Sequence, residues 1–232
     1  MRSLGIIGGM SWVSSAEYYR LLNEGVQKAL GGNHSAPIVM SSVDFQPYSD
    51  LLARGEWERI RDALVSEAQR LARTGVEAIA IATNTMHMFA DDIEKAAGLP
   101  VLHIADATAH RLHDAGYTLI GLMGTRHSME KDFYRTRLKE RHGIESLIPA
   151  SPERERINAI IFDELCAGRF LDASKKFLLG VVGSLAAQGV QCVVLGCTEL
   201  PLVIRQADVQ LPVVDTMSAH VQACLDFMLK DR

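Results

Sequence analysis

Short apolar runs alternate with longer segments of helical period along the whole chain. The runs that we predict to be strands are Leu4–Ile7, Ile38–Val43, Ala78–Ala82, Val101–His103, Leu119–Met123, Glu145–Ile148, Cys192–Leu195 and Val213–Val214. Between them, two sets of apolar residues share a helical face: Ile60, Leu64, Ala68 and Leu71, and then Leu178, Val181, Val182 and Leu185. This alternation is typical of β-α-β units. The pattern therefore predicts an α/β protein whose helices cover mostly parallel sheets.

One helix has recognisable end signals. Ser14 and Glu17 have the spacing of a capping box. Gly31 and Gly32 follow the last residue that fits the helical period. We therefore predict a helix that begins near Ser14 and ends before Gly31.

An internal repeat is the most informative feature of the sequence. Residues 74–85 and 188–199 align without a gap, which makes Thr83 and Cys197 counterparts. Three further pairs of segments match in order: 4–8 with 120–124, 17–20 with 132–135, and 99–101 with 211–213. The repeat predicts two similar halves, residues 1–116 and 117–232. Each is expected to have three αβα layers with a mostly parallel sheet, and the last helix of a half can cross over to pack on its partner.

Composition and charge narrow the class of partner. The chain of 232 residues is 48% hydrophobic and 22% charged, which is ordinary for a globular protein. Its formal net charge is −4, and Lys and Arg are scattered singly, so we expect neither a nucleic-acid nor a membrane surface. A small molecule is the expected partner. The N-terminal apolar run is too short for a secretion signal, so we expect a cytoplasmic protein.

Both repeat motifs end a predicted strand, which is where open α/β sheets bind ligands. If the halves pair about a pseudo-twofold axis, Thr83 and Cys197 lie on opposite sides of a cleft. A helix starting after Cys197 is expected to lower the pKa of its thiol and leave it accessible. The chain has no CxxC pair, so we predict no disulfides and read Cys166, Cys192 and Cys224 as inert core thiols.

The sequence resembles the aspartate/glutamate racemases that work without pyridoxal phosphate. The resemblance spans nearly the whole chain and rests on three motifs, residues 4–10, 83–87 and 196–199, each at a predicted strand end. It implies two α/β halves with the active site between them, no cofactor, and a homodimer. It also implies a two-base reaction, in which one cysteine removes the α-proton and another returns a proton to the opposite face.

This chain departs from the family pattern at one of the two bases. Thr83 stands where the family has its first cysteine, and Cys197 keeps the second. A threonine hydroxyl can donate a proton but hardly abstract one. By family analogy Cys197 faces the α-hydrogen of an L-amino acid. We therefore expect a preference for L-aspartate or L-glutamate as the starting substrate.

The resemblance also implies the substrate-binding residues. Those expected to bind the α-carboxylate or line the site are Met10 through its backbone, Asn84, Thr85, Thr125, Thr198 and Glu199. Glu199 is expected to hold the substrate ammonium or to tune Cys197. The family's cation for the distal carboxylate is missing after the second strand, which leaves Gln46, Tyr48, Arg54 or Arg126.

Other interpretations stay open. His87 could assist proton transfer by Thr83 or be a partly exposed polar residue, and His110 with His113 lacks a third ligand, so we expect no metal. A single-cysteine decarboxylase of malonate-type acids on the same fold is one alternative function. A non-catalytic ligand-binding module is another, although the glycines of residues 5–9 do not fit GxGxxG.

Overall fold

The computed structural model describes residues 1–230. The chain forms two compact units, one of residues 1–103 with the stretch from His220 onward, and one of Ile104–Ala219. The boundaries of the compact units thus differ from the boundary that the sequence repeat predicts. Helix α5 (Ile104–Asp114) belongs to the second unit, and most of α10 (Thr216–Leu229) belongs to the first. The predicted halves, 1–116 and 117–232, remain a prediction, and residues 231–232 lie outside the described range.

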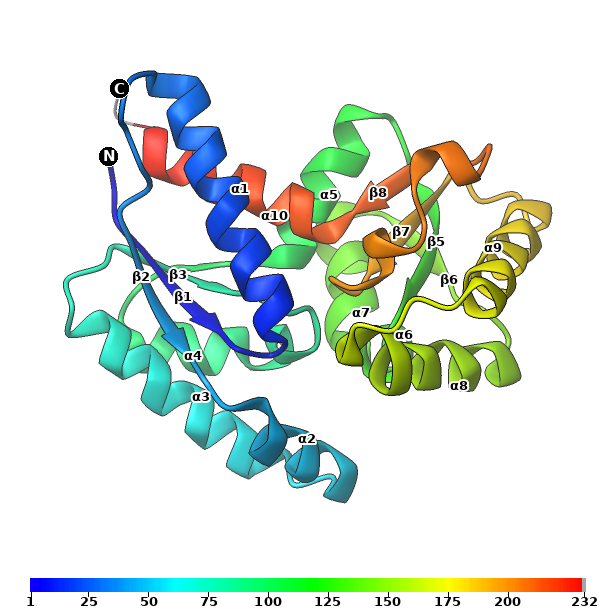
Figure 1. The fold of residues 1–232 in the computed structure, drawn as a ribbon, viewed down its shortest axis with the longest axis horizontal. Coiled ribbons are helices and arrows are strands. Elements are labelled where there is room, and N and C mark those ends of the chain that lie inside the picture. The colour runs from blue at the N-terminus through cyan, green and yellow to red at the C-terminus, as the bar shows by residue number, and fades with distance from the viewer. Residues whose placement is uncertain (231–232) are drawn as a thin grey trace. The chain divides into compact units, whose positions relative to one another are not determined.

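The first unit is built on a four-stranded parallel sheet. Its strands are β1 (Leu4–Gly8), β2 (Ile38–Ser42), β3 (Ala78–Ile81) and β4 (Val101–Leu102), in the order β2-β1-β3-β4. Its helices are α1 (Trp12–Leu30), α2 (Phe45–Arg54), α3 (Trp57–Ala72) and α4 (Ala90–Ala97), with a short 3₁₀ turn η1 (Thr85–Phe89) before α4. Helices α1 and α10 lie on one face of the sheet, and α3 and α4 cover the other (Figure 1).

The second unit repeats this plan. Its strands are β5 (Leu119–Gly124), β6 (Glu145–Leu147), β7 (Cys192–Gly196) and β8 (Val213–Asp215), in the order β6-β5-β7-β8 and again parallel. The remaining elements are α6 (Arg126–Glu130), α7 (Asp132–His142), α8 (Ser151–Ala159), the π-helical turn η2 (Ile160–Glu164), η3 (Leu165–Ala167), α9 (Asp172–Ala187), η4 (Leu200–Leu202) and η5 (Gln206–Asp208).

The sequence repeat is present in the register of the two sheets. In the first, Ile7 of β1 pairs with Ile81 of β3, and in the second Met123 of β5 pairs with Leu195 of β7. These pairs are the counterparts that the repeat aligns. The outer pairings agree as well: β3 and β4 join at residues 79 and 101, and β7 and β8 at residues 193 and 213. The two sheets therefore place residues 83 and 197 at the same position relative to their own strands.

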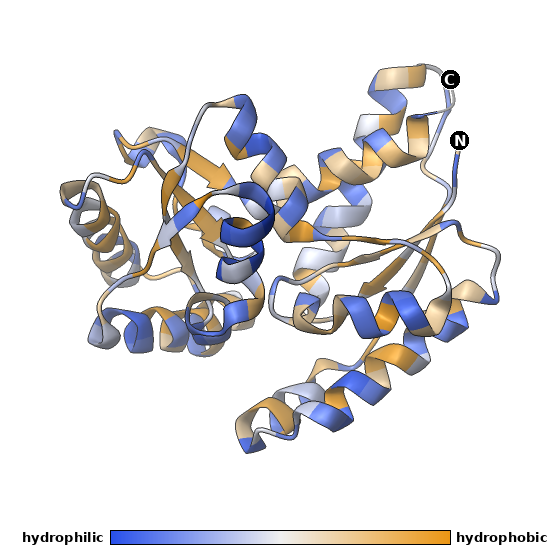
Figure 2. Ribbon diagram, turned by 180° about the vertical axis from the view of Figure 1, so that it is seen from behind, coloured by the Kyte–Doolittle hydropathy of each residue, from blue (hydrophilic) through white to orange (hydrophobic). Residues whose placement is uncertain are grey.

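The central strands of each sheet, β1 and β3 in the first and β5 and β7 in the second, are buried on both faces, which confirms the three-layer prediction. In β7, Val193 and Leu195 pack with α8 and α9, whereas Cys192 and Val194 pack with α5 and α7. Hydrophobic colour follows the strands and the inward sides of the helices, while their outward sides are polar (Figure 2). Parallel sheets covered on both faces have such continuous apolar strands, because neither side meets water.

The predicted start of the first helix is wrong, and its predicted end is confirmed. Helix α1 begins at Trp12, and Ser14 is buried inside it. The hydroxyl of Ser15 accepts a hydrogen bond from the N–H of Gly9 (2.7 Å) and donates one to the Ser11 carbonyl (3.0 Å). These bonds fix the turn three residues earlier than a Ser14 cap would. Gly31 follows the helix with a φ of 75°, a conformation that favours glycine.

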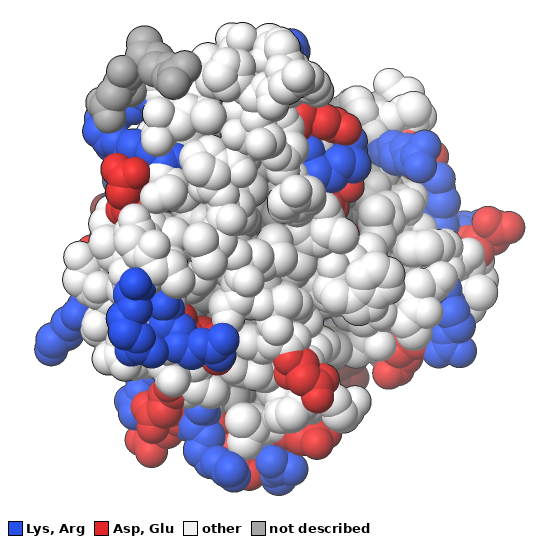
Figure 3. Space-filling model, turned by 60° about the vertical axis from the view of Figure 1, so that its left-hand side comes forward, with Lys and Arg blue, Asp and Glu red and all other residues white. Residues whose placement is uncertain are grey.

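Charged side chains are dispersed on the surface. On the face shown in Figure 3, basic and acidic groups alternate in small mixed clusters. Among residues 1–230, no helix combines the length and apolar character needed to cross a bilayer.

Candidate active site

The carboxyl end of β7 holds a thiol and a carboxyl group in contact. Cys197 Sγ donates to Glu199 Oε2 over 3.0 Å, and Thr198 Oγ1 donates to the same oxygen over 2.9 Å. Both hydrogen bonds end on this one carboxyl oxygen. Glu199 is only 4% exposed and Cys197 5%. A buried proton acceptor thus touches the thiol directly.

Glycine at the ends of β5 and β7 makes this arrangement possible. A Cβ atom on Gly124 would lie 2.6 Å from the carbonyl oxygen of Gly196. One on Gly196 would lie 3.0 Å from Leu122. Any larger residue at 124 would push the two strands apart just before Cys197. From the sequence alone, Gly196 is recognised only as part of the internal repeat.

The pKa expected for Cys197 must be corrected. Burial raises the pKa of the thiol well above its ordinary value, and the negative charge of Glu199 raises it further. The N–H of Glu199 acts in the opposite direction. No α-helix starts here, because a three-residue 3₁₀ turn, η4, follows instead. The predicted accessible, dipole-stabilised thiolate is therefore wrong: the resting group is a buried thiol, and Glu199 is its partner.

The other cysteines are free thiols, as predicted. Burial raises the pKa of Cys166 and of Cys192 to about 12 in each case. Cys166, in η3, packs against the same apolar cluster as Cys197, and the charge of Glu199 also raises its pKa. It is thus a second thiol in the neighbourhood, which the sequence did not reveal because 30 positions separate the two.

Thr125, the remaining predicted residue of the second unit, lies after β5. Its hydroxyl accepts a hydrogen bond from the N–H of Ser128 (3.2 Å) and caps α6. This cap explains why a hydroxyl residue stands at the strand end. It leaves the expected substrate contact as a prediction.

In the first unit, the carboxyl end of β3 carries Thr83, Asn84 and Thr85. Thr83 is half-buried, whereas Asn84 and Thr85 are only 3% and 6% exposed. Gly9, at the neighbouring end of β1, has a φ of 93°, and a Cβ there would lie 2.2 Å from the Val43 carbonyl oxygen. Only glycine lets the two chain segments approach this closely. Met10, next to it, is buried in the apolar core of this unit.

A cluster of buried imidazoles lies behind Thr83. The His87 ring is 4.8 Å from that of His103 and 5.3 Å from that of His220. His87 Nδ1 lies 2.8 Å from the Thr83 carbonyl oxygen, which can only accept, so Nδ1 carries the proton. Since the neutral ring has one N–H, Nε2 carries no hydrogen. No hydrogen bond of normal geometry reaches Nε2 among the described residues, although the Leu102 backbone is close enough to act on the pKa of the ring. His87 is therefore a buried residue that holds the Thr83 backbone, and the partly exposed reading is wrong.

The same reasoning fixes the tautomer of His220. Its Nε2 lies 2.6 Å from the Leu102 carbonyl oxygen and must donate. Its Nδ1 is then the acceptor for the Tyr18 hydroxyl at 2.8 Å. Burial lowers the pKa of His220 to about 4 and that of His87 well below its ordinary value. Both rings are neutral in the folded protein.

We expect this cluster to make the free energy of unfolding depend on pH between about pH 4 and pH 6.5, above the range in which most carboxyl groups titrate. A histidine that is neutral when folded is protonated in the unfolded chain below about pH 6.5, so stability falls as pH falls. For His220 alone the loss between pH 7.5 and 5 is about 2 kcal/mol. Urea unfolding at both pH values measures it. His220→Gln should reduce this pH dependence, whereas the exposed His34→Gln should not. An unchanged dependence in His220→Gln would contradict the assignment.

Three of the four candidates for the distal carboxylate already have a polar partner, and the fourth is buried. Gln46 is exposed on α2 and donates to Asp50 over 2.8 Å. Tyr48 is buried in the core of the first unit. The guanidinium of Arg54 pairs with Glu56, and that of Arg126 with Glu130. None of these contacts selects one candidate over the others.

No group of three His, Cys, Asp or Glu side chains within residues 1–230 is arranged to hold a metal ion. His110 and His113 are both exposed on α5.

Together, the fold and the site define a class of protein. It is an enzyme of two similar α/β units with parallel sheets, in which a thiol and a carboxyl group in contact at a strand end are suited to moving a proton. Residues 7–224 match the model of the Asp/Glu/hydantoin racemase family. The chain belongs to this family, and it is an isomerase of the amino-acid racemase type.

Individual relatives agree with the family assignment. The chain is 23% identical to the broad specificity amino-acid racemase RacX of Bacillus subtilis, across 96% of this chain and 94% of that protein. A candidate Asp/Glu racemase from Yersinia pestis superposes with a TM-score of 0.92 and 48% identity, covering 99% of this chain and all of that one. An aspartate racemase homologue from Pyrococcus horikoshii has a TM-score of 0.83 and 32% identity, over 99% and 100% of the two chains.

Proposed function

We propose that the protein racemises aspartate, glutamate or both without a cofactor, with a preference for the L enantiomer. The observation that carries this proposal is the 3.0 Å contact between Cys197 Sγ and Glu199 Oε2 at the end of β7. The names of the relatives, which include Asp/Glu and aspartate racemases, support the substrate class.

Cys197 is the proposed base for the L substrate. Because the buried thiol is protonated at rest, it must first lose its proton, and Glu199 is the acceptor in contact. The thiolate then takes the proton from the α-carbon, which leaves a carbanion beside the α-carboxylate. Proton transfer by a positioned group accelerates such steps by about 10²–10⁴-fold.

Thr83 is the proposed proton donor on the opposite face. Its hydroxyl protonates the carbanion and recovers a proton from solvent before the next turnover, while Cys197 releases the abstracted one. Since the hydroxyl is a poor base, the reverse reaction that starts from a D substrate is the slower one. The repeat supports the choice of these two residues, since β3 and β7 give them the same place in their own sheets.

The substrate contacts are proposed from the same correspondence. Buried donors at the two strand ends, Asn84 and Thr85 together with the backbone N–H of Thr198, hold the α-carboxylate and stabilise the carbanion through hydrogen bonds. Met10 contributes its backbone and Thr125 lines the site. Gln46 is the contact that we propose for the distal carboxylate, with Tyr48, Arg54 and Arg126 as open alternatives.

Exchange of the α-proton in deuterated water tests the function directly. Proton NMR follows loss of the α-hydrogen signal of L- and D-aspartate and of L- and D-glutamate. We expect exchange that is faster from the L forms. Equal exchange rates from the L and D forms would contradict the asymmetric mechanism. Release of CO₂ from a malonate, without exchange of the α-proton of the amino acids, would support the decarboxylase alternative.

Restoring a second thiol should improve the weaker direction. In Thr83→Cys we expect exchange from D-aspartate or D-glutamate to rise about tenfold, because a thiol at this position can abstract a proton where the hydroxyl cannot. Thr83→Ser, which keeps the hydroxyl, is the matched control and should keep the L preference. No gain from the D side in Thr83→Cys would argue against a role of residue 83 in proton transfer.

We further propose a cytoplasmic homodimer whose substrate is a small-molecule amino acid and which binds neither nucleic acid nor a membrane. Trp12 and Tyr19, 71% and 56% exposed, lie seven residues apart on one face of α1, as expected for a contact surface. Light scattering coupled to size-exclusion chromatography gives the mass in solution. A mass near 25.5 kDa would refute the dimer.

A further inference from the structure

A groove in the second unit is formed by two chain segments that follow η3 and η4. Its volume is about 360 Å³, within the range of small-ligand sites. It is lined by Phe170, Leu171, Asp172, Lys175, Leu202, Val203, Arg205, Ala207 and Asp208. None of the residues 196–199 is part of this lining. The groove is therefore distinct from the Cys197 and Glu199 pair.

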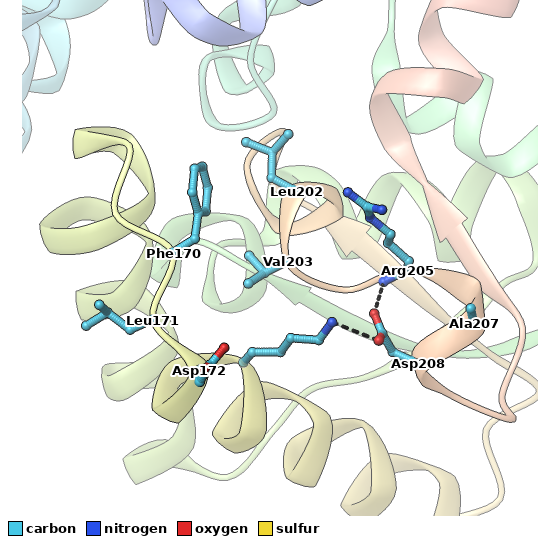
Figure 4. A pocket seen from close by; sticks show the side chains of 9 residues that line it. Phe170, Leu171, Asp172, Leu202, Val203, Arg205, Ala207 and Asp208 are labelled. Carbon is cyan, nitrogen blue, oxygen red and sulfur yellow. Dashed lines mark hydrogen bonds and ion pairs between the residues drawn. The ribbon is translucent and has the colours of Figure 1, made fainter.

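Apolar side chains are unusually exposed here. Phe170, Leu171 and Leu202 are 52%, 50% and 42% exposed, and they make up three of the seven large hydrophobic residues exposed in the described chain. Phe170 and Leu202 rise on either side of Val203, which is 6% exposed and forms the floor (Figure 4). Gathering exposed apolar groups around one hollow is typical of a binding site.

The charges of the groove leave the Arg205 guanidinium outside any close ion pair within residues 1–230, although its charge helps to lower the pKa of the Asp208 carboxyl. Lys175 Nζ pairs with Asp208 Oδ1 at 2.7 Å, and the backbone N–H of Arg205 donates to the other carboxylate oxygen at 2.9 Å. Both oxygens of Asp208 are therefore used. Asp172 is in the first turn of α9, where the helix dipole favours an acid. The exposed guanidinium of Arg205 forms no ion pair within residues 1–230.

We propose that this groove binds an amphipathic monocarboxylate, a small acid that carries an aromatic or branched aliphatic group. Its apolar body lies between Phe170 and Leu202 on Val203, and its carboxylate accepts hydrogen bonds from Arg205. A guanidinium suits this role because it presents paired donors to a carboxylate. The site does not depend on the racemase reaction, so its test is a binding measurement on the full chain.

The experiment uses 3-phenylpropionate as the probe and ¹⁵N–¹H spectra of the whole protein. We expect saturable shifts of the amides of Phe170, Val203 and Arg205, with a Kd of about 1 mM or tighter. The neutral amide, 3-phenylpropanamide, should bind at least about fivefold more weakly, because it lacks the charge that Arg205 recognises. Propionate, which lacks the apolar group, should not saturate.

Variants separate the guanidinium from general effects. Arg205→Gln should weaken the acid at least about fivefold and leave the amide unchanged. Arg141→Gln, at an exposed arginine on α7 outside the groove, should change neither. The spectra also report whether each variant is folded. Equal binding of acid and amide, or shifts that saturating L-aspartate abolishes, would overturn the proposal, and neither result depends on whether racemase activity is found.

Discussion

Cys197→Ser lowers the rate of α-proton exchange on L-aspartate and L-glutamate by at least about 10³-fold. The substitution keeps the size and hydrogen-bonding capacity of the side chain, so Glu199 Oε2 retains a donor at the position of Sγ. What changes is acidity, since Glu199 can accept a proton from a thiol far more readily than from an alcohol. Proton NMR in deuterated water measures the loss.

A second thiol in the same unit provides the control. Cys166→Ala removes a cysteine that packs against the same apolar cluster and feels the charge of Glu199. We expect its exchange rate to stay within about threefold of that of the unaltered chain, because the proposal gives this thiol no proton to move. If Cys166→Ala lost as much activity as Cys197→Ser, the base would be misassigned.

The fold followed from the sequence because its signals are local and occur twice. Apolar runs of strand length predict buried strands, and this prediction does not depend on the details of side-chain packing. The repeat then fixed which residues correspond, and the pairing of Ile7 with Ile81 and of Met123 with Leu195 follows that alignment. Gly31 ended α1 as expected, because a positive φ after the last turn depends on neighbouring residues alone.

The site was harder to predict because its energetics arise from burial and from distant segments. The sequence indicates that the Cys197 motif lies at the end of a strand, but it does not indicate the protonation state of the thiol. From the sequence, a strand end is expected to contact solvent. Here the apolar cluster of the second unit encloses Cys197, and this burial raises the pKa of its thiol. The imidazole cluster joins residues 87, 103 and 220, whose proximity no periodicity encodes. Spacing had located His87, but only the packing revealed that its ring holds a backbone carbonyl.

Glu199→Gln is the sharper test of how the buried thiol is activated. Glutamine has nearly the same shape, and its amide oxygen can still accept from Cys197 and Thr198, so the local structure should persist. The amide cannot take the proton, however. At neutral pH we expect exchange from L-aspartate to fall about 10²–10³-fold. Glu145→Gln, at an exposed carboxylate on β6, is the control and should be unaffected.

The pH dependence separates a proton acceptor from a structural residue. Without Glu199 the thiolate must form by loss of the Cys197 proton to solvent, so activity should rise about tenfold per pH unit while pH stays below the thiol pKa. Burial keeps that pKa high, although removing the charge of Glu199 takes away one of the causes that raise it. Raising the pH should therefore restore part of the lost exchange in Glu199→Gln, whereas the unaltered protein, whose thiol gives its proton to Glu199, should depend less on pH. Slower exchange with a pH profile parallel to that of the unaltered protein would mean that the carboxylate only positions the loop, because the route by which the thiolate forms would then be unchanged.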